Sequence, residues 1–472
     1  MEEMLERELK WEVDEDFALP RLDDIVAGAD VQRSTVQLDS AYYDTADGDL
    51  QAHGVLLRRR DGDDDTGWQM KVPDAEGRVE IRTALSDTPP SEITDMLTGM
   101  RLGKPLVNVA TIRTVRDRYR ITDTRRGRVG VEVDDDRVHA SVDHRLLAWR
   151  EIEVELGPAA RSIPARLADR LAKAGARPSR YPSKLARLSH VSPSPSLGGT
   201  AAGRALTAYI TEQIDHIFDG DLGLRRGSDP IHDTRVAIRR LRSTLRVFGK
   251  VLDHDAVAGI EDELKWFASE LGEVRDCQVQ RRRFQAALAQ LPPELVLGPV
   301  ANRINNDLQS DQLQARGRVT DTMGSQRYLE LLATLQRWRT APPIAAPPSV
   351  RALTKRARRA QRKADRRLVS AVETAEDELL HSARKAAKRA RYAAELRQPV
   401  QKRAKTTVKH YKQIQRVLGD HQDGVMASAT LRRLALTAGT TPGENGFTYG
   451  LLYAREQQAA EDARRRVREL AG

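Results

Sequence analysis

The feature that most constrains the fold is a change of hydrophobic periodicity near residue 200. Before it, short segments alternate polar and apolar residues between turn signals such as DGDDDTG and DAEG, which is the pattern of β-strands. After it, apolar residues recur at the spacing of amphipathic helices. The stretch SPSPSLGGTAAG lies at the change and is typical of a linker. The sequence therefore predicts an α+β protein with two domains, 1–190 and 204–472, joined by a linker at 191–203.

The two halves also differ in charge. Residues 1–190 carry 30 basic and 36 acidic side chains, a net charge of −6, whereas residues 191–472 carry 48 and 32, a net charge of +16. A basic domain attracts a polyanion such as nucleic acid, polyphosphate or an anionic membrane surface. Only 4% of the residues are aromatic and no nucleic-acid-binding motif is present, so nucleic acid is the disfavoured partner.

The compartment follows from what the sequence lacks. No run of 18 uncharged apolar residues occurs, so we expect no membrane span. The first ten residues are acidic and charged, unlike a signal peptide. Cys277 is alone, which excludes an internal disulfide and fits a reducing environment. These features predict a cytoplasmic protein.

In the first half, one face of each predicted strand is repeatedly charged, while apolar residues such as Val131 and Val133 occupy the other face. Eight or nine such strands predict a barrel or a strongly curved sheet, with helices around 90–100 and 162–175 packed outside it. The charged faces comprise Glu6, Glu8 and Lys10; Arg58 and Arg60; Arg78, Glu80 and Arg82; Glu132, Asp134 and Asp136; and Glu151, Glu153 and Glu155.

Two interpretations of the charged faces remain open. For any single strand, a charged face is usually the solvated outside of a sheet whose core lies behind it. Five such strands, with acidic and basic ones segregated, favour a barrel lined with charge and packed by apolar residues on its outside. Such a lining is costly when empty because confined charges lack partners. A divalent cation held by carboxylates and a polyanion held by Arg and Lys would compensate for that cost.

These segments resemble the CYTH, or triphosphate tunnel metalloenzyme, family. The resemblance starts with an ExExK pattern at Glu6, Glu8 and Lys10. It continues in order through YYDT, LLRRR, WQMKVP, RVE, VEVDDDRV, REIEVEL and YPSKLARL. The family implies an eight-stranded antiparallel β-barrel tunnel with flanking helices, which binds a triphosphate and Mg²⁺ or Mn²⁺. The implied activity is metal-dependent hydrolysis of inorganic triphosphate or related triphosphate and polyphosphate compounds.

The resemblance implies roles for individual residues, with Glu6, Glu8 and Lys10 as the catalytic set. The carboxylates that resemble metal ligands are Glu6, Glu8, Glu153 and Glu155, with Glu132 as a further candidate. The cations that resemble phosphate ligands are Lys10, Arg58, Arg60, Lys71, Arg78, Arg113, Arg116 and Lys184. Val115 stands where the family often has Arg or Lys, so the register of this strand is open and Arg118 is a substitute for Arg113 or Arg116.

The second half contains an internal repeat on either side of the Pro-rich segment APPIAAPP. The first copy of its basic motif, His232, Arg235, Arg239 and Arg242, is echoed by His381, Arg384, Lys388 and Arg391 at a constant offset of 149 residues. A second motif, LGEVRD, returns as LGDHQD at an offset of 147. Ten helical segments are expected here, including separate ones at 400–418 and 424–437, and they predict a pseudo-twofold pair of four-helix bundles.

Steps of three and four residues place each copy of the basic motif on one helix face. The closely spaced like charges repel one another, and a bound polyanion would relieve that repulsion. The arrangement resembles the CHAD domain, a conserved-histidine helical domain that binds inorganic polyphosphate in a basic central groove. The resemblance implies that the eight residues of the two motifs bind polyphosphate, with Arg240, Lys385 and Arg389 as weaker candidates. His421 aligns with Val274 rather than with a histidine, so it is not assigned a ligand role. The basic helix 351–367 is less patterned, and for it we expect simple solvation or peripheral attraction of the polyanion.

The sequence thus predicts an enzyme that hydrolyses triphosphates and binds polyphosphate, which could place it on polyphosphate granules. The alternative is a non-catalytic polyphosphate-binding protein that keeps the charged interior. The sequence does not indicate the oligomeric state or the preferred chain length.

Overall fold

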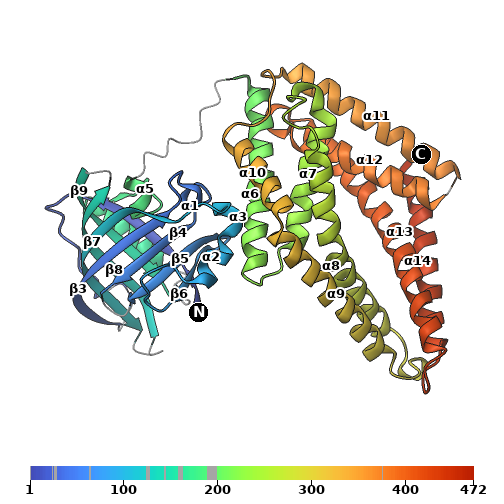
Figure 1. Cartoon of the computed structure of the whole chain (residues 1–472), viewed down its shortest axis with the longest axis horizontal. Helices are drawn as coiled ribbons and strands as arrows, with labels where there is room; N and C mark the ends of the chain where they lie inside the picture. Colours follow the sequence, from blue (N-terminus) through green and yellow to red (C-terminus); the bar gives the residue numbers. More distant parts are fainter. Residues whose placement is uncertain are drawn as a thin grey trace. The chain divides into compact units, whose positions relative to one another are not determined.

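The computed structural model describes residues 2–23, 25, 29–62, 65–123, 128–142, 145–157, 163–188, 199–374 and 376–471. The chain forms two compact units, Met1–Ser194 and Pro195–Gly472 (Figure 1). Most of the predicted linker, up to residue 198, lies outside the described residues. Within the described part of the chain, no helix is long and apolar enough to cross a membrane.

The first unit is built on one antiparallel sheet with the strand order β1-β6-β5-β4-β3-β7-β8-β9-β2-β10 (Figure 1). Its strands are β1 (Glu2–Glu6), β2 (Glu8–Val13), β3 (Ala29–Asp44), β4 (Leu56–Asp61), β5 (Gly67–Asp74), β6 (Gly77–Thr83), β7 (Val107–Asp123), β8 (Arg128–Val142), β9 (Arg145–Leu156) and β10 (Arg177–Pro178). Because only Arg7 separates β1 from β2, the chain itself links strands that lie near opposite ends of this order. The sheet is therefore strongly curved.

The strand pairing of this sheet differs from the predicted closed barrel of eight strands. The described residues form ten strands, and their hydrogen-bonded order is open. Two local features account for the higher number. The first strand is interrupted at Arg7, so that β1 pairs with β6 and β2 pairs with β9. The short strand β10 adds two more pairings at the edge of β2.

The apolar face of the sheet is covered by a helix. Val131, Val133 and Val154 are fully buried in a cluster that also includes Leu167 and Leu171 of α4 (Ile163–Lys173). The remaining helices of this unit are α1 (Asp49–Ala52), α2 (Ser91–Met96), α3 (Thr98–Arg101) and α5 (Lys184–Leu188). The apolar residues thus pack outside the sheet, which leaves its concave face to the charged residues.

The described part of the second unit contains α6 (Ala201–Arg225), α7 (Ile231–Phe248), α8 (Ile260–Leu288), α9 (Val300–Gly324), α10 (Gln326–Thr340), α11 (Val350–Thr374), α12 (Asp377–Glu395), α13 (Ala404–Ala438) and α14 (Phe447–Ala471). Thr200 begins α6, where its side-chain oxygen accepts a hydrogen bond from the backbone N–H of Gly203. The separate helices predicted at 400–418 and 424–437 are one helix, α13. No proline interrupts this stretch, and Gly419 and Gly424 are tolerated within it.

The internal repeat is visible in the helix order, because α6 to α9 correspond to α11 to α14 and α10 lies between the two sets. The two sets pack against each other through α7 and α12. Residues near the loops of the α8–α9 and α13–α14 hairpins share a core that includes Phe284, Ile304, Leu431 and Leu452 (Figure 1). The packing therefore crosses between the two halves of the repeat.

Candidate functional site

The concave side of the sheet holds a narrow cavity, here called the sheet cavity. Its lining is almost entirely charged, and β1 to β7, β9 and α5 all contribute to it. The lining residues are Glu6, Glu8, Lys10, Tyr42, Leu56, Arg58, Arg60, Asp65, Lys71, Arg78, Glu80, Arg82, Arg116, Glu153, Glu155, Ser183 and Lys184.

Strand register brings the acidic residues of this site together. Glu8 lies opposite Glu155, and Lys10 lies opposite Glu153, across the β2–β9 pair. The close approach of β6 to the chain at Glu6 requires glycine, because a Cβ at Gly77 would lie 2.3 Å from the Glu6 carbonyl oxygen. The segment with the ExExK pattern therefore lies between two sides of the cavity. One side, formed by β4 to β6, carries most of the arginines, and the other is the acidic strand β9.

Buried ion pairs neutralise much of the acidic side. The Lys184 ammonium contacts Glu153 at 2.5 Å, Asp136 at 2.8 Å and Glu151 at 2.9 Å. Arg116 contacts Asp136 and Glu153 at 2.7 Å. Despite its burial, the pKa of Glu153 is held well below its usual range by Lys10, Lys184 and Arg116. The unliganded site thus supplies its own counter-charges.

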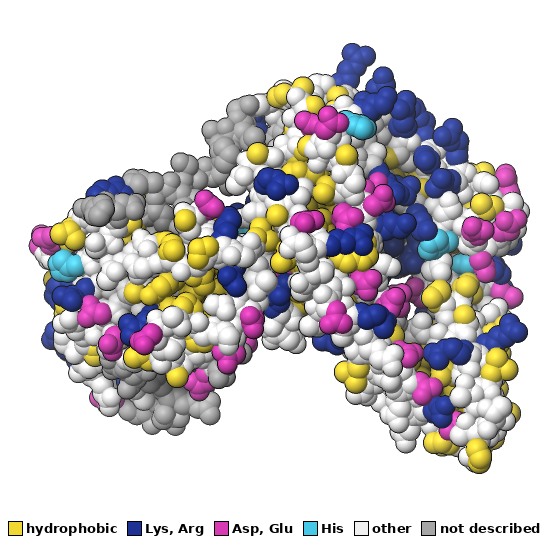
Figure 2. Space-filling view, viewed as in Figure 1, with side chains coloured by type: hydrophobic (Ala, Val, Ile, Leu, Met, Phe, Trp, Pro, Cys, Tyr) yellow, Lys and Arg dark blue, Asp and Glu magenta, His cyan; other side chains and the backbone are white. Residues whose placement is uncertain are grey.

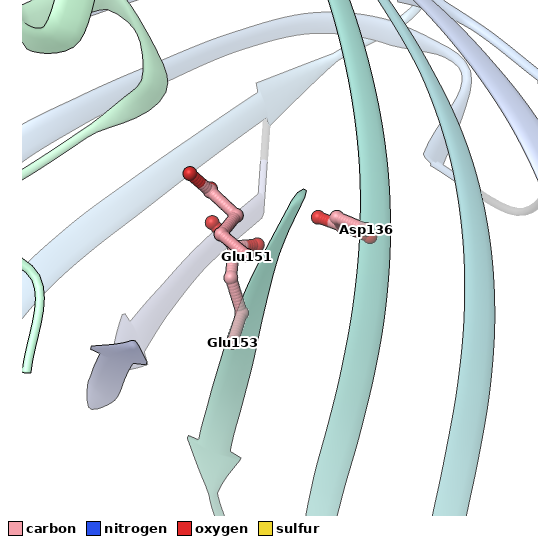
Figure 3. A group of neighbouring side chains, drawn as sticks. All are labelled: Asp136, Glu151 and Glu153. Atoms are coloured by element: carbon pink, nitrogen blue, oxygen red, sulfur yellow. The ribbon is translucent and has the colours of Figure 1, made fainter. Parts of the chain in front are cut away.

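Asp136, Glu151 and Glu153 form a group in which one carboxylate oxygen of each residue lies within 4.8 Å of the other two (Figure 3). Asp136 comes from β8 and the two glutamates come from β9, and Asp136 lies opposite Glu151 in the ladder. All three are buried. Three carboxylates at this spacing could hold a divalent cation. Their ion-pair partners are Lys184 and Arg116, so a cation bound there would have to displace those side chains.

A second set of carboxylates is less well neutralised. Glu6 accepts a hydrogen bond from Lys71 at 2.6 Å through one oxygen, whereas its other oxygen is buried without a hydrogen-bond partner among the described residues. Burial, the Glu153 charge and the Glu6 charge raise the pKa of Glu8 against the effect of Lys10. Burial and the Glu6 charge raise the pKa of Glu155 to about 8. An oxygen-preferring divalent cation fits this surplus of negative charge.

The structure places most of the predicted residues in this cavity. Glu6, Glu8, Glu153, Glu155 and the predicted cations other than Arg113 all line it. Glu132 is not in the lining. It is half-buried and its carboxylate pairs with Arg118 and Arg120, each at 2.9 Å.

The prediction for Arg113 is wrong. Its side chain is 64% exposed and pairs with Asp39 at 2.8 Å on the outer face of the sheet. Arg113 and Arg116 are three residues apart on one strand, so they point to opposite faces. Arg118, the proposed substitute, is buried on the same face as Arg116 and contacts Glu132.

Several residues of the site were not predicted. Asp136 and Glu151 share a face with predicted ligands, but their proximity depends on the register between β8 and β9. Tyr42 and Asp65 come from segments without charge alternation. Tyr42 accepts a hydrogen bond from Arg58, and Asp65 pairs with Arg60 at 3.3 Å. Cross-strand register, rather than any local pattern, selects these residues.

The second unit holds a basic cavity between the two copies of the repeated motif, here called the groove. Both α7 and α12 contribute to its lining, which contains no acidic residue. The lining residues are Arg239, Arg242, Ser243, Arg246, Lys265, His381, Arg384, Lys385, Lys388, Arg389 and Tyr392. The two basic faces therefore converge on one space.

Like charges dominate the electrostatics of the groove. Burial together with Arg384, Arg239 and Arg235 lowers the pKa of Lys388 to about 7. Burial and Arg239 also lower the pKa of Arg384, against the effect of Asp423. The nearest carboxylate contact of Arg384 is Asp423 at 3.9 Å. The cations of the groove are thus only partly compensated.

The glycines of the repeated LGEVRD and LGDHQD motifs have a steric role that the sequence alone did not reveal. A Cβ at Gly272 would lie 3.1 Å from the Arg235 guanidinium, and a Cβ at Gly419 would lie 3.1 Å from the Arg384 guanidinium. Each glycine thus lets an arginine of the repeated motif lie close to the neighbouring helix. The same pairing in both copies supports the assignment of the repeat.

Of the eight predicted polyphosphate ligands, Arg239, Arg242, His381, Arg384 and Lys388 line the groove. His232 is exposed at the start of α7, and Arg235 lies close enough to Lys388 to lower the pKa of its ammonium. Arg391 pairs with Glu395 at 2.9 Å. His421 is buried against Asp377 and Arg464, away from the groove lining.

Comparisons with known proteins agree with this architecture. A CYTH domain model matches residues 4–187 and a CHAD domain model matches residues 208–432. An uncharacterized protein of Mycobacterium tuberculosis strain CDC 1551 / Oshkosh is 34% identical over 500 residues, covering 98% of this chain and 95% of that protein.

Two solved structures resemble parts of the chain. PptA from Streptomyces chartreusis is 22% identical, with coverage of 57% of this chain and 98% of that chain and a TM-score of 0.48. The CHAD domain from the plant Ricinus communis is 25% identical, with coverage of 58% and 92% and a TM-score of 0.46. The two domain models and the full-length relative show that the chain belongs to the family of proteins in which a CYTH domain, of the triphosphate tunnel type, precedes a CHAD domain.

Proposed function

We propose that the first unit hydrolyses inorganic triphosphate or a related phosphoanhydride with the help of a divalent cation, and that the second unit binds inorganic polyphosphate. The observation that carries the enzymatic part is the sheet cavity, where phosphate-binding cations and undercompensated carboxylates face one space. A triphosphate and a metal together would balance both sets of charges.

Mg²⁺ or Mn²⁺ is the cofactor that this donor set favours, because every candidate ligand is a carboxylate oxygen. Glu6, Glu8 and Glu155 would hold it, with Glu153 beside them. A divalent cation bound there would neutralise phosphate charge and make an attacking water more acidic. The three carboxylates of Figure 3 are a second candidate site, with Lys184 as its competitor.

The cations of the chain have a separate task. Arg58, Arg60 and Lys71 on β4 and β5 would hold the phosphate oxygens in line for attack, and Lys184 and Arg116 would contribute from the acidic side. Phosphoryl transfer depends mainly on positioning and on charge stabilisation. Arg58 donates to Gln69 at 2.6 Å, which fixes the direction of its guanidinium before the substrate enters.

A phosphate-release assay with tripolyphosphate and Mg²⁺ or Mn²⁺ tests this proposal. We expect turnover that EDTA abolishes and that Glu8→Ala lowers by about 100-fold or more, because a metal ligand is lost. Glu12→Ala is the matched control, since Glu12 lies on the same strand, is half-buried and does not line the cavity. Turnover that survives both EDTA and Glu8→Ala would refute the metal-dependent mechanism.

The second candidate function is binding without catalysis. The ion pairs of Lys184 and Arg116 favour it, because they would let the empty cavity persist as a stable receptor. In that case the same assay would detect no phosphate release, while tripolyphosphate would still protect the first unit against thermal unfolding.

Polyphosphate binding by the second unit is supported by one observation. The two basic motifs converge on one groove, where they have few carboxylate partners. A flexible polyanion such as polyphosphate would relieve their mutual repulsion and release its own counter-ions. The residues proposed to contact it are Arg239, Arg242, His381, Arg384 and Lys388, supported at the ends of the motifs by His232, Arg235 and Arg391. Polyphosphate in the groove could bring the protein to polyphosphate granules.

A further inference from the structure

A third cavity lies where α11 passes the end of α7, and it is called the α11 cavity here. It adjoins the groove, because Arg246 and Arg389 line both spaces. Its other cations include Arg356, Arg359 and Lys363 from α11. Figure 2 shows dark blue Lys and Arg side chains gathered over α11 and in the recess beside it.

Helix α11 carries its cations beside the face that it buries. Its buried residues include Leu353, Ala357 and Leu368, whereas Arg359 and Lys363 are exposed. In the first copy of the repeat, α6 packs against both α7 and α10. Helix α10 lies between the two copies and contacts α6, α8 and α9.

Several cations of the α11 cavity have no carboxylate partner. Among the described residues, no carboxylate forms an ion pair with Arg356, Arg359, Lys363 or Arg389, whereas Arg246 pairs with Glu261. The Nε atom of Arg356 is buried and has no hydrogen-bond partner among the described residues. Arg367 and Arg389 contribute to lowering the pKa of Lys363. An unliganded face of this kind favours an anion.

The α11 cavity differs from the groove in its apolar walls, to which Val247, Leu252, Val257, Ala360 and Ala386 contribute. Val247, Val257 and Ala360 are half-buried, so a bare phosphate chain would leave part of each in contact with water. A ligand with an apolar or planar group would cover them. We propose that the α11 cavity is a second binding site that takes a nucleoside polyphosphate, with the phosphates on the α11 cations and the nucleoside against the apolar wall. This site is independent of the polyphosphate and triphosphatase functions proposed above.

The test measures ATP binding to the full chain by calorimetry in metal-free buffer with EDTA. We expect Arg359→Glu with Lys363→Glu to weaken ATP binding by roughly 10-fold or more, because two charge-assisted phosphate contacts are reversed. Arg358→Glu with Arg362→Glu is the matched control. Both pairs are exposed, lie four residues apart on α11 and change the net charge equally, but the control pair does not line the cavity.

A third variant, Val257→Ser, tests the apolar wall. It should weaken ATP binding by a few-fold, since apolar burial is lost, and leave tripolyphosphate binding unchanged. Tripolyphosphate is the probe that supplies the phosphates without the nucleoside. Far-UV circular dichroism should show that each variant keeps its helix content, and Lys363→Gln provides a milder replacement if the double variant does not.

Three results would overturn the proposal. Equal losses in the two charge pairs would mean that the general positive charge of α11 binds ATP. Equal affinity of the wild type for ATP and tripolyphosphate, together with no effect of Val257→Ser, would mean that no nucleoside site exists. Absence of measurable ATP binding would also refute it. Long-chain polyphosphate, titrated into the same variants, reports separately on the groove, so the two proposals can fail independently.

Discussion

The sheet cavity and the groove both gather cations, but they differ in how those cations are neutralised. In the sheet cavity, Lys184 alone contacts three carboxylates within 2.9 Å, and the pKa of this lysine lies well above its usual range despite burial. In the groove, Lys388 is surrounded by Arg384, Arg239 and Arg235, and its pKa falls to about 7. One lysine completes an ion-pair network, whereas the other adds to an existing excess of charge.

The difference in counter-charge determines which kind of ligand each site can bind. A site that carries both signs must exchange internal ion pairs for an anion and a metal together, so its ligand has to be specific. A site that carries an excess of one sign gains from any polyanion of suitable shape, and its binding is expected to depend strongly on salt. Catalysis suits the first arrangement and recruitment suits the second.

The sharpest test of this comparison replaces each lysine with methionine. Lys184→Met should lower the free energy of unfolding of the first unit by about 3–5 kcal/mol, because buried carboxylates lose their partner. Lys388→Met should instead raise that of the second unit by about 1 kcal/mol or more, because a cation among like charges is removed. Calorimetric unfolding of the full chain checks both values. Destabilisation of similar size in both variants would break the comparison.

A smaller effect is expected for polyphosphate binding to the groove. Arg239→Glu with Lys388→Glu should weaken long-chain polyphosphate binding by roughly 30-fold and reduce the salt dependence, since local counter-ion release is reversed. Arg358→Glu with Arg362→Glu serves as the control with the same charge change outside the groove, and it should cost only a few-fold. Fluorescence anisotropy with labelled polyphosphate measures both. Losses of equal size would show that bulk charge, rather than the groove, binds the chain.

The smallest effect concerns pH. The pKa of Lys388 is lowered to about 7 in the free protein, and a bound polyanion should raise it again, so that binding takes up a proton above pH 7. Polyphosphate affinity should therefore fall about 3- to 10-fold between pH 7 and 8.5. The stability of the free protein changes with pH in the opposite direction from its affinity. The unfolded chain holds the Lys388 proton more tightly than the folded one, so the free energy of unfolding rises as pH increases above 7.

Lys388→Arg is the matching control for the pH experiment, because a guanidinium stays charged throughout this range. Its polyphosphate affinity should change little between pH 7 and 8.5. Proton uptake itself is measured by titration in two buffers of different ionisation enthalpy. A wild-type affinity that is flat over this range would show that Lys388 is already fully charged in the free groove.

Local patterns in the sequence predicted the charged interior well. Alternation along β4 places Arg58 and Arg60 on one face, and the helical steps of α7 bring Arg239 and Arg242 to the groove. Patterns that depend on distant strands were less informative. The group of Asp136 with Glu151 depends on the β8–β9 register. The register of β7, which the sequence left open, places Arg116 and Arg118 inside and Arg113 outside, because residues three apart on a strand point to opposite faces.

The α11 cavity illustrates a different limit of sequence reasoning. Arg356, Arg359 and Lys363 belong to a helix so rich in basic residues that simple solvation was the expected reading. Their proposed role depends on the cavity that α11 forms with the end of α7. A charge pattern within one helix does not contain that information.

The interruption of the first strand at Arg7 has a consequence for the order of folding. The segment Glu8–Val13 pairs with Arg145–Leu156, and the segment Glu2–Glu6 pairs with Gly77–Thr83. During synthesis, β1 and β2 can therefore both pair only after about 150 further residues have been translated. Contacts of such long sequence separation form slowly. Enclosure of the charged interior is thus a late event, and the residues that complete the site are among the first to be translated.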